Sequence, residues 1–359
     1  MSKNLLLGLT SRTMMVFMAG LLGLSYLSIV VNPAQVWVFV FFGIMFIPFF
    51  LINLSLLFWA AKRRSRSIII PLIALLPSLF FFGKQFQFLG KDDLAEDENK
   101  AVKIASYNVG RFMAYGDSEN RRTRDVCMDS IFNYIFQEDV DIICLQEVYL
   151  SRRKSITSQL RAKIKKYKPE YYFYKTKYGH SGNLTISKYP AVNKGVVTFD
   201  DSKNLVLYSD YKIGKENFRV YNCHLESYAV SLPAIASSIA NEDVDNIKKT
   251  ETKIKGSIYR RSQQVNKILE HIEASPLDAF VCGDFNDTPT SYTYYKLKKS
   301  RIDNYVEAGR GFGATYSKLW PLIRIDYVLS PKDFKVLSYK SPRLPFSDHY
   351  PVITEVEIL

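Results

Sequence analysis

The sequence predicts an α/β domain that follows an N-terminal transmembrane helical segment. Three observations support this fold class. The first 90 residues contain long apolar stretches and no acidic residue, and from residue 101 onward strand-like alternation and helix-like spacing follow one another. In addition, many of the expected strands end in polar side chains. With 359 residues, 47% of them hydrophobic, the chain has room for about two domains with a substantial core.

Three apolar stretches within residues 1–90 predict transmembrane helices: residues 13–31, 36–61 and 68–82. The first two reach the roughly 17–25 residues that a bilayer requires. The third is shorter and contains Pro71 and Pro77, which leaves a re-entrant or interfacial segment as an alternative. A cleaved signal peptide is an alternative for the first stretch, although two further apolar stretches follow it.

Charge predicts the orientation of these helices, because basic residues stay preferentially on the cytoplasmic side of a membrane. Lys3 and Arg12 lie ahead of the first stretch, and four basic residues lie within residues 62–66, between the second and the third. We therefore expect an integral membrane protein whose catalytic domain, beyond Lys84, lies outside the cytoplasm. The orientation reverses if the third stretch does not cross.

The rest of the chain is only mildly basic. Residues 91–100 are predicted to form a polar linker and residues 101–359 a catalytic domain; of the net charge of +13, the first 90 residues carry +7. The remaining +6 fits a phosphorylated or polyanionic substrate, but many inert proteins share it. The four cysteines lack zinc-ligand spacing and three lie in apolar runs, so we expect core residues and leave a disulfide open.

Beyond the linker, apolar or alternating runs predict strands and 3.6-residue spacing predicts helices. Strands are expected at residues 102–109, 141–148, 171–174, the run up to 187, 204–211, 217–223, 280–283, 324–329 and the end of the chain. Helices are expected at residues 121–138, 151–168, 260–272 and 291–299, and residues 227–258 are expected to form a partly helical surface excursion.

Residues 280–289, FVCGDFNDTP, carry the clearest single signal. An apolar run that closes in Gly and Asp predicts a buried strand and a turn that presents Asp284 and Asn286 together. A carboxylate beside an amide on a stiff strand suits water activation and phosphate contact. Taken alone, however, the stretch is better explained as an ordinary Asx-rich turn.

Other expected strand ends and loops carry the same kinds of side chain, namely Asn108, Glu147, His224, Asp326, Asp348 and His349. Carboxylate and amide oxygens are ligands that Mg²⁺ prefers, and imidazoles suit proton transfer. An acid such as Glu147 at the end of a buried strand is costly unless it is paired or metal-bound. A core imidazole for His224 and a structural cap for Asp326 are the non-catalytic alternatives.

These residues lie in short motifs that occur in a fixed order: Ser106-Tyr107-Asn108, Leu145-Gln146-Glu147, His224-Leu225, Gly283-Asp284-Phe285-Asn286, Ile325-Asp326-Tyr327 and Ser347-Asp348-His349. Through them, over residues 101–359, the chain resembles the endonuclease/exonuclease/phosphatase superfamily. That superfamily includes pancreatic-type deoxyribonuclease, abasic-site endonucleases, neutral sphingomyelinases and inositol polyphosphate 5-phosphatases. The resemblance implies a four-layered α/β sandwich of two packed sheets flanked by helices, with the site at one edge where strand ends converge.

The resemblance also implies a metal and a water site. The residue matching Glu147 binds a divalent metal, Mg²⁺ with Mn²⁺ or Ca²⁺ as alternatives, and the residue matching Asn108 lies beside it. The residues matching Asp284 and Asn286 position the attacking water and the phosphate.

The remaining motifs imply phosphate and proton contacts. The residue matching His349 contacts the scissile phosphate or transfers a proton, and the one matching Asp326 holds it. Asp348 matches a residue that completes the metal and hydrogen-bond network, and His224 matches a phosphate contact.

A turn before residue 187 departs from one branch of the superfamily. It carries Ser181-Gly182-Asn183 in place of the Asn-Lys-Gly associated with phosphoinositide phosphatases, which argues against that branch. His180 and Asn183, on or beside this turn, are predicted to bind substrate.

The function predicted from the sequence is a membrane-anchored, divalent-metal-dependent phosphoester hydrolase, specifically a phosphodiesterase of nuclease type acting outside the cytoplasm. The basic run at residues 152–168 favours nucleic acid, and the expected membrane anchor favours a phospholipid or sphingomyelin headgroup as the alternative substrate. The expected partners are therefore a phosphodiester and the lipid bilayer, with no obligate protein partner evident. A non-enzymatic membrane receptor or scaffold on an inactive hydrolase domain is the alternative of another class. A transporter is disfavoured, because the apolar stretches lack internal charge.

Overall fold

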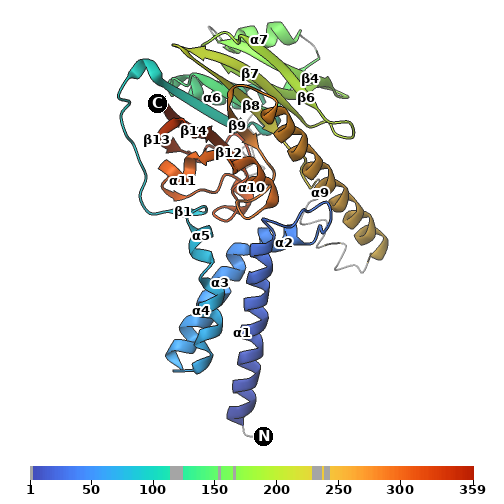
Figure 1. The fold of residues 1–359 in the computed structure, drawn as a ribbon. Coiled ribbons are helices and arrows are strands. Elements are labelled where there is room, and N and C mark those ends of the chain that lie inside the picture. The colour runs from blue at the N-terminus through green and yellow to red at the C-terminus, as the bar shows by residue number, and fades with distance from the viewer. Residues whose placement is uncertain (1–2, 114–123, 153–154, 165–166, 229–236, 238–242) are drawn as a thin grey trace.

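The computed structural model describes residues 3–113, 124–152, 155–164, 167–228, 237 and 243–359. In this part of the chain two six-stranded sheets pack face to face (Figure 1). The first sheet has the strand order β10 (Arg301–Asp303), β12 (Asp326–Pro331), β9 (Asp278–Asp284), β8 (Glu216–His224), β7 (Leu205–Ile213) and β6 (Asn193–Thr198). The second has the order β13 (Phe334–Lys340), β14 (Val352–Ile358), β2 (Ala101–Asn108), β3 (Ile142–Ser151), β5 (Gly179–Ser187) and β4 (Lys168–Lys175).

Helices cover the outer faces of both sheets. On the second sheet lie α6 (Arg124–Gln137) and α7 (Ile156–Ile164), whose buried residues join the core cluster that contains Ile143 and Leu145 of β3. On the first sheet lie α9 (Val244–Glu273) and α10 (Tyr292–Lys298). The predicted α/β sandwich with two sheets is therefore confirmed.

The core between the sheets explains why the central strands are apolar on both faces. Ile104 and Cys144 of the second sheet pack with Phe218, Phe280 and Val328 of the first, while alternate residues of the same strands face the helices. All four cysteines are free and buried, as expected for core residues.

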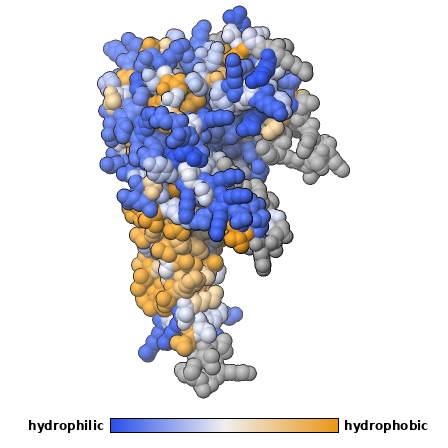
Figure 2. Space-filling model, turned by 90° about the vertical axis from the view of Figure 1, so that its right-hand side faces the viewer, coloured by the Kyte–Doolittle hydropathy of each residue, from blue (hydrophilic) through white to orange (hydrophobic). Residues whose placement is uncertain are grey.

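The N-terminal residues form five helices among the described residues, α1 (Lys3–Leu27), α2 (Phe39–Ile44), α3 (Phe46–Lys62), α4 (Ile69–Leu75) and α5 (Ser78–Phe82). They enclose a small core of their own around Leu22, Phe46, Leu75 and Phe81. Figure 2 shows apolar side chains gathered on the outside of these helices as well, below the hydrophilic surface of the sheet domain.

The prediction of transmembrane helices is wrong. Across the described ranges, no helix combines the length and the apolarity needed to cross a membrane. Residues 36–61 divide at Met45 into α2, with 6 residues, and α3, with 17. Residues 68–82 divide at Pro77, which has no N–H to continue α4. Helix α1 has 25 residues but includes the charged Lys3 and Arg12.

The predictions that depended on those helices fail with them. The assignment as an integral membrane protein with an extracytoplasmic domain is wrong. It inferred the orientation from the basic loop at residues 62–66, and that inference requires helices that span the membrane. The lipid bilayer as a partner loses its support for the same reason.

The N-terminal helices instead contact the sheet domain. Thr290 Oγ1 donates to Gly43 O at 2.7 Å, and Ser28 Oγ donates to Thr290 O. Ser262 Oγ of α9 donates to Asn32 Oδ1 at 3.0 Å. This junction of Ser28, Asn32, Gly43, Ser262 and Thr290 joins α1 and α2 to the turn that follows β9.

The described structure also contains two short strands and one short helix: β1 (Phe86–Gln87), which pairs with β11 (Gly311–Phe312), and α11 (Asn304–Ala308). The predicted linker, residues 91–100, lies along the domain, where Lys91 N donates to Ala308 O and Asp93 N to Leu337 O. The division into residues 1–90, 91–100 and 101–359 stays a prediction.

Candidate active site

Four of the predicted site residues lie at neighbouring strand ends. Strands β8 and β9 are parallel, so His224 and Asp284, their last residues, are Cα partners. Strand β12 is antiparallel to β9 and begins with Asp326, which is also a partner of Asp284. Asn108 ends β2 in the facing sheet, and its Nδ2 donates to Asp284 Oδ2 at 2.9 Å. Both sheets thus deliver polar groups to one edge of the sandwich.

His349 lies against two buried carboxylates at this edge. Its Nδ1 is 2.9 Å from Asp326 Oδ2, and its Nε2 is 3.9 Å from Asp284 Oδ2. Asp284 and Asp326 are almost fully buried, and only 8% of the His349 side chain is exposed. The three side chains have ligand atoms within 4.8 Å of one another.

The charges of this group depend on one another. Burial alone would lower the pKa of His349, but Asp326 and Asp284 outweigh it and raise the pKa to about 10. Burial raises the pKa of Asp284, and His349 partly offsets that rise. At neutral pH, His349 is therefore a cation balanced by the carboxylates, and its Nδ1–H donates to Asp326.

Asn286 sits on a strained turn directly after β9. Its φ is +51°, in the left-handed region. Its backbone N–H donates to Asp284 Oδ1 at 2.8 Å, and its Nδ2 donates to Leu225 O at 2.9 Å and to Asp284 Oδ2 at 3.2 Å. The turn therefore holds the carboxylate of Asp284 between two amides, those of Asn108 and Asn286.

Arg261 of α9 supports this turn and was missed from the sequence. It is 2% exposed; its Nη1 donates to Asn286 O at 2.9 Å and to Glu226 O at 2.8 Å, and its Nε lies 3.4 Å from Asp287 Oδ2. Burial raises the pKa of Asp287, and Arg261 opposes that rise. The sequence does contain a signal that Arg261 is buried: it follows Ile258 by three residues and therefore lies on the same apolar face of α9.

Glu147 occupies a bulge in β3. The register of β3 against β5 shifts between Leu145 and Val148, and Glu147 has a φ of +52°. Its carboxylate lies 3.7 Å from His224 Nε2 and 3.6 Å from Arg111 Nε. Both distances exceed those of direct hydrogen bonds.

Glu147 and His224 line a pocket of about 170 Å³ on the surface. Arg111, Lys203 and Tyr174 also line it. Two cations therefore face the same small space as Glu147, and the pocket presents positive charge at the edge where the strand ends meet.

Three predicted site residues lie elsewhere or face away. The Asp348 carboxylate contacts Lys318 Nζ at 3.1 Å. His180 pairs with Leu150 and Lys175 within the second sheet, and because neighbouring residues of a strand alternate, it faces away from the pocket that Ser181 lines. Asn183 is buried between the sheets, where its Nδ2 is 3.3 Å from Asn222 O.

Asn183 belongs to a buried amide cluster that also contains Gln146 and Asn222. Gln146 Nε2 donates to Asn222 Oδ1 at 2.8 Å, and Asn222 Nδ2 donates to Thr185 Oγ1 at 3.1 Å. This cluster ties β3, β5 and β8 together behind the pocket. Asn222 was not predicted as a site residue.

The donor groups fit a hard divalent cation such as Mg²⁺. Within the described ranges, Asp326 Oδ1 is buried without a hydrogen-bond partner. The carboxylate of Glu147 makes only the two long contacts described above. Carboxylate oxygens without hydrogen-bond partners are the kind of oxygen ligand that Mg²⁺ takes.

Comparison with known proteins identifies the family. The model of the Endonuclease/Exonuclease/phosphatase family matches residues 105–349, and that of a domain of unknown function, DUF8431, matches residues 6–85. No curated protein matches the chain.

Solved structures resemble the chain at low identity. An endonuclease/exonuclease/phosphatase from Beutenbergia cavernae is 17% identical with a TM-score of 0.54, and the match covers 72% of each chain. The human nocturnin catalytic domain is 15% identical with a TM-score of 0.53, over 74% of this chain and 96% of that one. A family protein from Bacteroides thetaiotaomicron is 18% identical with a TM-score of 0.52, over 72% and 98%.

At such identities the solved structures bear on the fold alone, and the family model decides the assignment, since it spans well over half of the chain. The chain belongs to the endonuclease/exonuclease/phosphatase family, whose members hydrolyse phosphoesters and generally use divalent metal ions.

Proposed function

We propose that this protein is a divalent-metal-dependent phosphodiesterase of nuclease type. The observation that carries the proposal is the buried group of Asp284, Asp326 and His349, which lies beside a cationic pocket that also contains Glu147. In-line attack on a phosphoester needs a positioned water, neutralised phosphate oxygens and a stabilised leaving oxygen. This edge of the sandwich offers a group for each need.

Asp284 is the proposed water-positioning base. Its carboxylate is fixed by the amides of Asn108 and Asn286, so its orientation needs no adjustment during the reaction. Its pKa is raised by burial, which brings a carboxylate closer to the range in which it accepts a proton effectively. Asn286 is proposed to contact the water or the phosphate.

His349 is the proposed phosphate contact or proton donor. It is held protonated by Asp326, so Nε2–H faces Asp284 and the space where the phosphate would lie. His224 is proposed to contact a phosphate oxygen from the pocket side. Asp348, paired with Lys318, is proposed to act through the neighbouring backbone of His349, and not directly.

Glu147 and Asn108 are proposed to hold Mg²⁺, with Mn²⁺ or Ca²⁺ as alternatives. When bound, the cation would neutralise charge on the phosphate and acidify a water. Glu147 suits this role because it is half-buried and makes no direct hydrogen bond with either Arg111 or His224. Asn108 Oδ1 accepts from Gly110 N at 3.1 Å, and a carbonyl oxygen has a second lone pair for a ligand.

Charge around the pocket favours a nucleic-acid diester. Arg111 and Lys203 line the pocket, and Arg161 adds positive charge on α7, where Lys163 is paired with Asp129. Part of the basic run, residues 153–154 and 165–166, lies outside the described residues. The Arg111 side chain is 54% exposed, so the site opens to the surface and a chain continuing beyond the phosphate can be accommodated.

The proposal is tested by assaying the full chain with bis(p-nitrophenyl) phosphate, p-nitrophenyl phosphate, DNA and RNA, each with Mg²⁺ and with EDTA. We expect Mg²⁺-dependent hydrolysis of the diester and of at least one nucleic acid. Hydrolysis of the monoester alone would replace the diesterase by a phosphomonoesterase, and activity that survives EDTA would overturn the metal dependence.

A further inference from the structure

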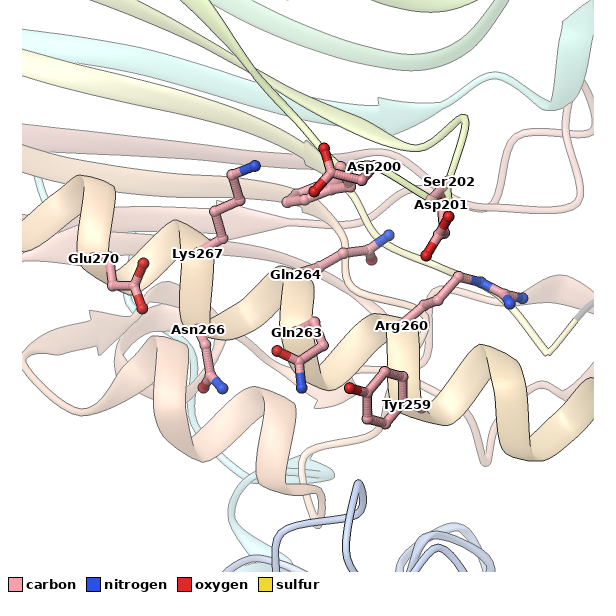
Figure 3. Close-up of a pocket in the computed structure, with 11 residues that line it drawn as sticks. Asp200, Asp201, Ser202, Tyr259, Arg260, Gln263, Gln264, Asn266, Lys267 and Glu270 are labelled. Carbon is pink, nitrogen blue, oxygen red and sulfur yellow. The ribbon is translucent and has the colours of Figure 1, made fainter.

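A second and larger cavity lies next to the pocket of the candidate active site and is lined by other residues. It has a volume of about 390 Å³ and lies between α9 and the turn of residues 199–204, which connects β6 to β7 (Figure 3). None of the residues assigned above to catalysis or metal binding lines it. Its volume falls within the roughly 300–1,000 Å³ of small-molecule sites.

Gln264, on the floor of this cavity, has a hydrogen-bond donor without a partner. The residue is 1% exposed, and its Oε1 accepts from Glu226 N at 2.8 Å. That bond fixes the amide orientation, because a flip would set two donors against each other. Nε2 then has no hydrogen-bond partner among the residues that the structure describes. A buried donor left unpaired costs about 1–3 kcal/mol, so a ligand that accepts from it gains that much.

Charge in the cavity argues against an anionic ligand. Asp200, Asp201 and Glu270 contribute three carboxylates. Of the two lining cations, Arg260 is already paired with Glu226 Oε1 at 2.9 Å, which leaves Lys267. A phosphate or carboxylate ligand would meet net negative charge and be repelled.

The same groups suit hydroxyls. Gln264 and Lys267 donate hydrogen bonds, and the three carboxylates accept them. The lining therefore complements ligand groups that both accept and donate hydrogen bonds. Phe199 and the half-exposed Tyr259 add flat apolar surface, against which the C–H faces of a ring can pack. Figure 3 shows Gln264 and Lys267 extending from α9 toward the turn that carries Asp200.

We infer that this cavity binds a neutral, polyhydroxylated small molecule of the size of a sugar or cyclitol. Its hydroxyls accept from Gln264 Nε2 and Lys267 and donate to Asp200, Asp201 and Glu270.

The bound molecule would lie next to the candidate active site. The turn that carries Asp201 and Ser202 continues into Lys203 and Asn204, which line the pocket with Glu147. Ser202 Oγ donates to Glu226 Oε2 at 2.5 Å, and Glu226 follows His224 by two residues. The inference concerns binding only and does not depend on the proposed hydrolysis.

Saturation-transfer NMR on the full chain tests the inference, with glucose and myo-inositol as probes and inorganic sulfate as the anionic comparison in a parallel calorimetric titration. We expect transfer to at least one polyol and no sulfate binding at this cavity. Lys267→Ala removes an exposed donor and should weaken polyol binding ~10-fold, the value of one charge-assisted hydrogen bond. Lys249→Ala, on an exposed position of the same helix outside the cavity, is the matched control and should leave binding unchanged.

A second variant probes the buried donor. Gln264→Glu keeps the oxygen that accepts from Glu226 N–H and removes the donor, so it should abolish polyol transfer while the melting temperature shows that the fold remains. Should this variant not fold, Lys267→Ala decides alone. Absence of saturation transfer to either polyol, or equal binding by Lys267→Ala and Lys249→Ala, would overturn the inference.

Discussion

The carboxylate of Glu147 is incompletely paired by the protein itself. The residue stands on a bulge with positive φ, and its carboxylate makes only long contacts with Arg111 and His224. A strained, incompletely paired acid on a bulge within a strand is typical of a position kept for ligand binding. A variant that preserves the shape of the side chain therefore best distinguishes its proposed role in metal binding from a structural role.

Glu147→Gln should lower Mg²⁺-dependent diester hydrolysis by ~100-fold or more, since metal stabilisation of the transition state is worth several kcal/mol. Manganese binding, measured by calorimetry, should weaken in parallel. The melting temperature should stay within about 2 °C, because surface substitutions away from core contacts change stability little. Unchanged hydrolysis and unchanged metal affinity would contradict the assignment.

Asp326 is expected to act by positioning His349. In Asp326→Asn the side-chain shape is kept but the charge that holds His349 protonated is lost, so the upper pH limit of kcat should move to lower pH and kcat at neutral pH should fall by ~10²–10⁴. A purely structural role would lower activity at all pH values without moving the profile. Initial rates from pH 5 to pH 10 distinguish the two.

His349 also predicts a pH dependence of stability. Its pKa is raised from 6.5 to about 10 in the folded protein, so the stabilisation is fully present below pH 6.5 and is lost as the pH rises through about 10. In EDTA, the melting temperature should fall across this window in the wild type and fall less in His349→Gln. Equal slopes in the two proteins would contradict the contribution of His349.

At the scale of elements, β10, α11 and β12 are held together by a buried ion pair. Arg324 donates to both carboxylate oxygens of Asp303 at 2.9 and 2.7 Å, and both residues are fully buried. Asp303 also caps α11 through Tyr305 N and accepts from Tyr294 OH. Burial opposes ionisation of Asp303, but Arg324 outweighs it and holds the pKa of Asp303 below its usual range.

Arg324→Met should destabilise the protein by about 3–5 kcal/mol, because it leaves an uncompensated buried carboxylate. The free energy of unfolding, from urea titration monitored by circular dichroism, measures this loss. Arg310→Met, which removes a positive charge from the exposed neighbourhood of α11, should cost less than about 0.5 kcal/mol. Similar losses in the two variants would contradict a special role for the pair.

The accuracy of the sequence-based prediction follows the strength of the local pattern. Strands β3 and β9 were found because they are buried on both faces and read as apolar runs, and β2 was found because its residues alternate. Strands β6 and β13 were missed, since each is an edge strand with mixed polarity. Helix α9 was expected to begin at residue 260 but begins at Val244, because its first half is rich in lysine and lacks a continuous apolar face.

The site was predicted in part for the same reason. Asp284, Asp326 and His349 were placed together because strand ends meet at a sheet edge, and the motif order identified them. Arg261 and the unpaired donor of Gln264 were not found, because their roles depend on contacts across the chain, with Asn286 and Glu226. No local pattern records a contact of that kind.

At the scale of the molecule, the N-terminal helices bear on the candidate active site through the junction with Thr290. A Cβ on Gly43 would lie 2.5 Å from Thr290 O and 2.7 Å from Ser28 Oγ, closer than packed atoms allow. Thr290 follows Asn286 by four residues, and Ser262 of the junction is next to Arg261, which holds Asn286. A displacement at the junction therefore reaches the turn that fixes Asp284.

Gly43→Ala should lower the free energy of unfolding by about 1–3 kcal/mol, as overpacking does, and should reduce kcat without removing any proposed catalytic group. Gly20→Ala is the matched control: no atom lies within 4 Å of its added Cβ, so both quantities should stay near wild type or rise slightly. Equal activity in the two variants would show that the helices do not influence the site.

The four buried cysteines can report on the separation of the layers of the sandwich. Cys127 lies between the second sheet and its helices, Cys144 and Cys282 lie between the sheets, and Cys223 lies between the first sheet and α9. Burial raises the pKa of Cys223 and of Cys282, so the reactive thiolate is scarce while the layers are closed. The rate at which a thiol reagent labels each cysteine therefore measures how fast one particular pair of layers separates. The order in which the cysteines are labelled gives the order in which the layers separate during unfolding.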